Sequence, residues 1–142
     1  MLATSGESGL WACSVFYAYN DAELLFASSK NSKHGMDIGK GANVAFAITD
    51  TTQTPAKTAI GIQGTGYCRP ARISEASKFI RHYATRFPKY SSTHGNLSNL
   101  VKLIKTADNR PYVLEIKQIK YTNKNLFETP QYFDFHRQAG KA

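Results

Sequence analysis

The sequence is poor in residues that build covalent or metal-dependent sites. Its two cysteines, Cys13 and Cys68, lie far apart in apolar, strand-like surroundings, and its four histidines occur singly. No CxxC pair is found, and no Cys/His cluster has the spacing of zinc ligands. The sequence therefore predicts two buried free thiols and no metal site.

Long apolar runs are also missing. No stretch approaches the roughly 20 apolar residues that cross a bilayer, and residues 1–7 lack the basic start and apolar core of a secretory leader. No arrangement suggests a Ser/His/Asp triad or a pair of catalytic carboxylates. We therefore expect a cytoplasmic protein with no membrane partner, and we assign no catalytic side chain.

Acidic residues are outnumbered by basic ones. Ten Asp and Glu stand against 18 Lys and Arg, so the net charge is +8. Such an excess raises the local concentration of anionic partners, although it also serves simply to keep a surface soluble. The basic residues form no block, and the aromatic signature of an RNA-binding sheet is missing, so binding to nucleic acid is the weaker hypothesis.

The composition is that of one folded domain spanning residues 1–142. Hydrophobic residues make up 42% of the chain and aromatic residues 12%, and a chain of this length buries roughly two thirds of the surface that it exposes when unfolded. No internal repeat or linker divides it.

Alternating apolar residues predict a mainly antiparallel sheet. We expect strands at 2–5, 10–19, 24–28, 44–48, 59–73 and 112–121. The strand at 10–19 is apolar on both faces, which predicts that both are covered, and turn residues 20–23 predict a hairpin with 24–28. A bulge is expected near Lys117-Gln118. The glycines at 61, 64 and 66 are not a dinucleotide-binding motif, because no helix begins there.

Two helices are expected late in the chain. Apolar residues at helical spacing predict one over 74–87, with Ser74 as N-cap and Pro88 after its end, and a shorter one over 97–104. The fold class is therefore α+β, a closed or nearly closed antiparallel β-barrel with helices packed at the side. Four aromatic residues in the tail are expected to dock on the body or on a second subunit; these are Phe127, Tyr132, Phe133 and Phe135.

A polar cluster between two predicted strands is the strongest functional signal. Its hydroxyl and cationic side chains stand where a turn opens a short helix, an arrangement suited to holding a phosphate group. The cluster consists of Ser28, Ser29, Ser32, Lys33 and His34. The alternative is an ordinary solvated turn in which Ser28 or Ser32 only caps the helix.

Several segments, taken in order, resemble the FMN-binding split barrels related to pyridoxamine 5'-phosphate oxidase, in particular a small bacterial branch. They are Leu10–Tyr17, Leu25–Ser29 with Ser32–His34, Val44–Ile48, Ile62–Gly66 and Leu114–Tyr121. The resemblance extends over roughly residues 2–135. It implies a split barrel that forms a homodimer and binds FMN in two symmetric clefts at the subunit interface.

The resemblance also implies roles for individual residues. Ser28, Ser29, Ser32, Lys33 and His34 match the positions that hold the FMN phosphate, with Lys33 where Arg is usual and His34 in place of a lysine. Around the isoalloxazine ring the matching residues are Cys13, Ser14, Val15 and Phe16 below the ring, and Gln63 and Gly64 from the neighbouring strand.

Two departures from the oxidase limit what the resemblance implies about the reaction. Residues 13–16 lack the arginine found on that strand of the oxidase, and the C-terminal Trp and Arg associated with pyridoxamine phosphate are not found. We therefore expect a flavin-dependent oxidoreductase with another small-molecule substrate. The alternative is a non-enzymatic carrier or sensor of flavin or of another phosphorylated ligand.

Overall fold

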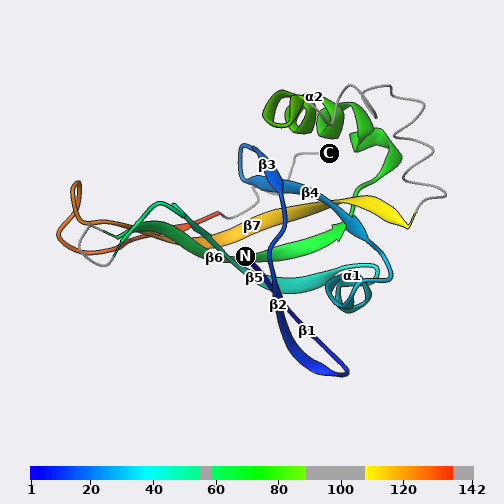
Figure 1. Ribbon diagram of the computed structural model, residues 1–142, viewed down its shortest axis with the longest axis horizontal. Helices are drawn as coiled ribbons and strands as arrows, with labels where there is room; N and C mark the ends of the chain where they lie inside the picture. The colour runs from blue at the N-terminus through cyan, green and yellow to red at the C-terminus, as the bar shows by residue number, and fades with distance from the viewer. Residues whose placement is uncertain (55–58, 89–107, 136–142) are drawn as a thin grey trace.

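Eight antiparallel strands form one sheet in the computed structural model of the protein, which describes residues 1–54, 59–88 and 108–135 (Figure 1). The strands are β1 (Leu2–Gly6), β2 (Gly9–Cys13), β3 (Tyr17–Asn20), β4 (Glu23–Ser29), β5 (Ala42–Thr49), β6 (Ile60–Pro70), β7 (Asn109–Asn123) and β8 (Gln131–Asp134). Helix α1 (Lys33–Ile38) follows β4, and a 3₁₀ turn, η1 (Ile73–Glu75), leads into helix α2 (Ala76–Arg86).

The order of the strands rolls the sheet into a barrel. Neighbours run β2-β1-β5-β6-β7-β4-β3, and β8 pairs separately with β7. Since Ser14–Phe16 alone joins the two edge strands β2 and β3, the chain passes directly from one edge of the sheet to the other. The predicted class, α+β with a mainly antiparallel barrel and helices at its side, is confirmed.

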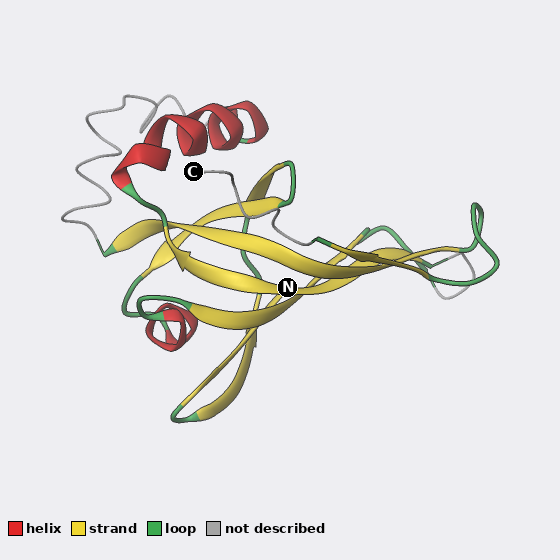
Figure 2. Ribbon diagram, turned by 180° about the vertical axis from the view of Figure 1, so that it is seen from behind, coloured by secondary structure: helices red, strands yellow, loops and turns green. Residues whose placement is uncertain are grey.

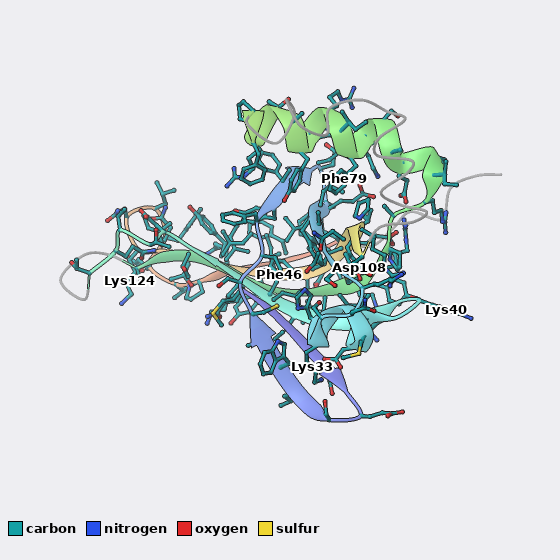
Figure 3. All side chains as sticks on the ribbon, turned by 45° about the vertical axis from the view of Figure 1, so that its right-hand side comes forward. Lys33, Lys40, Phe46, Phe79, Asp108 and Lys124 are labelled. Atoms are coloured by element: carbon teal, nitrogen blue, oxygen red, sulfur yellow. The ribbon has the colours of Figure 1, made fainter. Side chains whose placement is uncertain are left out.

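Alternation along the strands fills two separate cores. The first core joins Ile38 of α1 to strand side chains inside the barrel, namely Leu2, Leu24, Phe26, Val44, Phe46, Cys68, Tyr112 and Leu114. On the outer face of β3, β4 and β7, helix α2 packs Phe79 and Tyr83 against Leu25 and Val113. The two views in Figures 2 and 3 show α2 on this outer side and Phe46 within the barrel.

Several local predictions agree with the structure. Helix α2 lies within the predicted 74–87, although its N-cap is Glu75 rather than Ser74 because η1 occupies that turn. The bulge is found where it was expected: Thr65 pairs with Gln118 and Gly66 with Ile116, so Lys117 is the extra residue. The predicted helix 97–104 lies outside the described residues.

The prediction for residues 10–19 was wrong in two respects. The segment is two strands, because the chain must cross from β2 to β3 at Ser14–Phe16. Strand β2 is also exposed in the single chain, with Leu10 85% and Trp11 48% accessible. The β3–β4 hairpin is tighter than predicted, since Asn20 pairs with Glu23 and only Asp21 and Ala22 form its loop.

None of the helices in the described part of the chain is long and apolar enough to cross a membrane.

Candidate functional site

The predicted anion site lies where β4 ends and α1 begins. The Oγ atom of Ser28 is 2.6 Å from Nε2 of His34, and the Oγ atom of Ser32 is 3.2 Å from the same nitrogen. His34 is buried, with 9% of its surface exposed, while both serines are partly buried. Three of the five residues of the cluster therefore converge on one imidazole nitrogen.

Local backbone chemistry holds this arrangement in place. Ser32 is the N-cap of α1: its Oγ accepts from the backbone N–H of Gly35 at 3.1 Å and donates to the carbonyl of Ser29 at 2.7 Å. Gly35 has no space for a side chain, because a Cβ would collide with the Ser29 carbonyl oxygen. The capping role that was the alternative for Ser32 is thus confirmed, and it brings His34 to Ser28.

A count of hydrogens indicates which protons remain for a ligand. The single hydroxyl hydrogen of Ser32 is directed to the Ser29 carbonyl, so Ser32 meets His34 as an acceptor. We therefore assign the imidazole proton to Nε2, where it faces both hydroxyl oxygens. Ser28 then also accepts from His34, and its own hydroxyl hydrogen is left to donate to a bound group.

His34 lies in an environment that favours its neutral form. Burial lowers the pKa of His34 from its ordinary value of 6.5, while the nearby carboxylate of Asp37 acts in the opposite direction. An anion bound at Ser28 would act like Asp37 and favour the imidazolium form.

We predict that the ligand-free protein loses stability as the pH falls below about 6.5. Because the pKa of His34 is lower in the folded than in the unfolded chain, the unfolded chain binds more protons in this window, and acid favours it. Urea unfolding at pH 8, 7, 6 and 5 measures the effect, and His34→Gln should flatten the curve. An identical pH dependence in both proteins would contradict the assignment.

Lys33 does not face the serine–histidine cluster but is held by Asp37. Its Nζ donates to the two carboxylate oxygens at 2.6 and 2.8 Å, and Thr4 of β1 donates to the same carboxylate at 2.7 Å. These hydrogen bonds, from Lys33 first and Thr4 second, hold the pKa of Asp37 below its usual value. Figure 3 shows Lys33 where α1 meets the β1–β2 hairpin. The structure thus separates Lys33 from the other four residues by an ion pair.

Ser29 is at the outer rim of the site. Its Oγ accepts from the backbone N–H of Asn31 at 3.1 Å, which leaves the Ser29 hydroxyl hydrogen available. Asn31 donates from its side chain to Asp108 at 3.0 Å, and Lys30 lies 4.0 Å from the same carboxylate. Because successive residues of β4 face opposite sides of the sheet, Ser29 lies on the same side as Leu25 and not beside the Ser28 hydroxyl.

The sequence analysis missed one cation at this site, Arg110. It stands directly opposite Ser28 in the β4–β7 ladder, so both side chains lie on the same face of the sheet. Its Nε donates to the hydroxyl of Tyr112 at 3.0 Å and its Nη2 to the carbonyl of Gly39 at 3.2 Å. No sequence signal links Arg110 to Ser28, because the register of two strands more than 80 residues apart is a tertiary property.

The other predicted cofactor residues divide between two places. Cys13 and Val15 pack against the interior of the barrel, whereas Ser14 and Phe16 are exposed. Phe16 meets the ring of Phe87 edge-on, with 5.8 Å between ring centres. Ser14–Phe16 precedes β3, which pairs with β4, so this segment lies near the Ser28 end of β4.

Gln63 and Gly64 lie on β6 and form no described hydrogen bond with the cluster. Gly64 pairs with Ile119 of β7, nine residues from Arg110, which pairs with Ser28. At about 3.3 Å per residue the separation along the strand is roughly 30 Å. The space beside Gly64 is filled by the Phe46 ring and the Gln118 carbonyl, so the absent side chain serves internal packing.

Solved structures with the same fold come from several bacteria. A heme binding protein from Mycobacterium smegmatis gives a TM-score of 0.67 at 14% identity, over 94% of this chain and 51% of that one. The conserved hypothetical protein Rv2991 from Mycobacterium tuberculosis gives 0.66 at 14% identity, over 97% and 84%. A Clostridium acetobutylicum protein related to general stress protein 26, of the pyridoxinephosphate oxidase family, gives 0.62 at 10% identity, over 94% and 83%.

These similarities are structural and concern the fold. The chain spans about half the length of two of the solved structures that it matches, 51% of the Mycobacterium smegmatis protein and 49% of the protein Atu2129 from Agrobacterium tumefaciens. The sequence matches no model of a known protein family and no curated protein. The expected fold, the split barrel of pyridoxamine-phosphate-oxidase-like proteins, is confirmed by this comparison.

Proposed function

Since the chain has the split-barrel fold of the pyridoxamine 5'-phosphate oxidase-like proteins, we propose that it is a homodimeric FMN-binding protein. The observation that carries the proposal is the convergence of the Ser28 and Ser32 hydroxyls on Nε2 of His34 at the end of β4. With the proton assigned to Nε2, Ser28 keeps a hydrogen to donate. Charge-assisted hydrogen bonds from such hydroxyls to a phosphate are stronger than those to neutral acceptors.

The residues present fit a phosphate monoester. With the imidazole proton assigned to Nε2, the hydroxyl hydrogen of Ser28 is available to donate to a phosphate oxygen. Ser32 fixes the orientation of His34, which in turn fixes Ser28, so Ser32 supports the site without touching the ligand. Arg110 adds a positive charge on the same face of the sheet. Lys33 contributes little charge, because Asp37 neutralises it at 2.6 Å.

Two chains are needed to complete the site in this proposal. Gln63 and Gly64, expected near the isoalloxazine ring, lie roughly 30 Å along β7 from the partner of Ser28. In the dimers of the family that the sequence resembles, FMN lies in clefts at the subunit interface, so a second copy would bring its own Gln63 to the first copy's cluster.

A sheet face that neither described helix covers supports the dimer. Helix α1 packs on the Thr4 face of β1, and α2 packs on β3 and β4, so neither helix covers the Ala3 face. Small side chains form a cross-strand row there, namely Ala12, Ala3, Ala45 and Thr65. Beside them Leu10 and Lys117 line a groove of about 430 Å³. Small side chains permit the close approach of a flat surface, and the exposed Leu10 supplies an apolar anchor.

The activity that follows is that of a flavoprotein oxidoreductase with a small-molecule substrate. FMN would supply transfer of electrons between a donor and an acceptor, while this chain binds the phosphate, orients the ring and limits access of water. The second candidate is a flavin carrier or sensor. It is favoured by the Lys33–Asp37 ion pair, which withholds one cation from the phosphate and so weakens its retention.

Titration with FMN, combined with measurement of the molecular mass, tests the proposal. We expect flavin fluorescence to be quenched at one FMN per chain, in a particle of twice the mass of the chain. Riboflavin, which lacks the phosphate, should bind at least tenfold more weakly. Haem is the competing ligand, and its binding without FMN binding would refute the proposal. Repeated reduction by NADH or NADPH and reoxidation would distinguish the enzyme from the carrier.

A further inference from the structure

We propose that Arg110, and not Lys33, is the cation that holds the phosphate group at this site. The inference rests on the proposed function and adds to it a binding residue from β7, a strand that the predicted phosphate cluster does not include. It also assigns Lys33 a structural role, in which it fastens α1 to β1 through Asp37 and Thr4.

The first argument is position. Ser28 and Arg110 are direct partners across the β4–β7 ladder, and the Cβ atoms of such partners lie about 4.5–5.5 Å apart on the same face. Tyr112, the next residue of β7 on this face, is fully buried in the barrel. Arg110 thus stands at the mouth of the barrel, beside the Ser28 hydroxyl, with its side chain only partly buried.

The second argument is charge. Among the described residues, no carboxylate forms an ion pair with Arg110, whose contacts are a hydroxyl, a carbonyl and the face of the Tyr112 ring. Lys33 is held by both oxygens of Asp37, a side chain that is only 6% exposed. To bind a phosphate, Lys33 would have to leave this partner, whereas Arg110 would lose only neutral ones. An uncompensated guanidinium is the stronger anion ligand.

The third argument is the geometry of the guanidinium. Two of its five N–H groups are engaged, one with Tyr112 and one with Gly39. These two contacts, together with the Tyr112 ring 5.2 Å away, fix the plane of the group. Three N–H groups remain for a ligand, enough for the paired hydrogen bonds that an arginine makes to two phosphate oxygens.

Three variants of the full-length protein test the inference: Arg110→Gln, Arg110→Lys and, as a matched control, Lys33→Met. Affinities for FMN and for riboflavin are measured by fluorescence quenching, and the melting temperature is measured for each variant. We expect Arg110→Gln to weaken FMN binding about 10- to 100-fold with riboflavin unchanged. The FMN affinity of Arg110→Lys should lie between those of Arg110→Gln and the wild type, because lysine keeps the positive charge but cannot form the paired hydrogen bonds of a guanidinium. Lys33→Met should melt earlier, yet bind FMN within about threefold of the wild type.

The outcomes are distinguishable. Wild-type FMN affinity in Arg110→Gln, or an equal loss in Lys33→Met, would overturn the inference while leaving the proposed function intact. A lower melting temperature in Arg110→Gln without a change in the FMN-to-riboflavin ratio would make Arg110 merely structural. If Arg110→Gln does not fold, the intermediate affinity expected of Arg110→Lys decides the question.

A readout without flavin separates this inference from the proposed function. Inorganic phosphate is titrated into the wild-type protein, and the Nε–H signal of Arg110 is followed by NMR, assigned by its loss in Arg110→Lys. A saturable shift in a protein that does not bind FMN would support Arg110 as an anion ligand and refute the flavin. No shift with phosphate and no binding of FMN would refute both.

Discussion

Replacing Arg69 by methionine is expected to lower the free energy of unfolding by about 3–5 kcal/mol. Arg69 lies on β6 with 10% of its side chain exposed, and its guanidinium bridges two carboxylates. It donates to Glu75 at 2.8 and 2.9 Å and to Glu115 at 3.0 and 3.2 Å. Methionine fills similar space but leaves the two carboxylates facing each other without the guanidinium, and so the folded state is penalised.

Urea unfolding measures this loss, and Lys78→Met is the matched control. Lys78 joins the same network, 2.6 Å from Glu23 and 3.6 Å from Glu75, but it is more exposed at 24%. Lys78→Met should lower the free energy of unfolding by less than about 1 kcal/mol, as is usual for ion pairs near the surface. Equal losses in the two variants would show that the bridge contributes no more than a surface pair.

The same network makes the stability of the folded protein depend on pH in the acid range. Hydrogen bonds from Arg69, which outweigh the effect of burial, lower the pKa of Glu75 to about 2. Because this value is below that of the unfolded chain, the contribution of Glu75 is fully present above about pH 4.5 and is lost as the pH falls towards 2. Arg69→Met should therefore also lose part of the acid dependence seen in the wild type.

Replacing Leu10 by arginine is expected to dissociate the proposed dimer and to abolish tight FMN binding. Leu10 is 85% exposed on β2 and lines the groove over the small residues of β1, β5 and β6. The effective penalty for burying an unpaired charge is several kcal/mol, and each penalty of about 1.4 kcal/mol raises the dimer dissociation constant tenfold. FMN affinity should fall together with the mass, because the partner's residues leave the site.

Ile73→Arg is the control for this substitution. Ile73 is also an exposed apolar residue, at 53%, but it lies in η1 beside α2, away from the Ala3 face. We expect the mass of the Ile73→Arg protein, measured by sedimentation, and its FMN affinity, measured by fluorescence quenching, to equal those of the wild type. A Leu10→Arg protein that remains a dimer with full FMN affinity would exclude this face as the interface.

Part of the candidate site could be predicted from the sequence. Ser28, Ser32 and His34 are at most six positions apart along the chain, and the local helix cap at Ser32 brings them together. The pairing of Lys33 with Asp37 is a local i,i+4 contact that the sequence analysis did not use. The hydrogen bond from Thr4 of another strand to the same carboxylate was not visible in the sequence. Arg110 was missed because only the β4–β7 register places it beside Ser28.

Part of the fold, too, could be predicted from the sequence, and part could not. Periodicity determined most of the strands, helix α2, the bulge at Lys117 and the α+β class, because each depends on which residues within a short window are buried. It did not predict β8, which lies in the segment expected to be a tail. It did not determine the break at Ser14–Phe16, because closure of a barrel requires a crossing whose place depends on the whole sheet.

By itself, the sequence thus determined the alternation of buried side chains along most elements, although not on β2, and which polar residues stand together after β4. Apart from local pairs such as Lys33–Asp37, the tertiary structure decided which charges are neutralised, since ion pairs such as Arg69–Glu115 join strands that are distant in sequence. The physical reason is that burial follows from local periodicity, whereas the environment of a charge depends on every element packed around it.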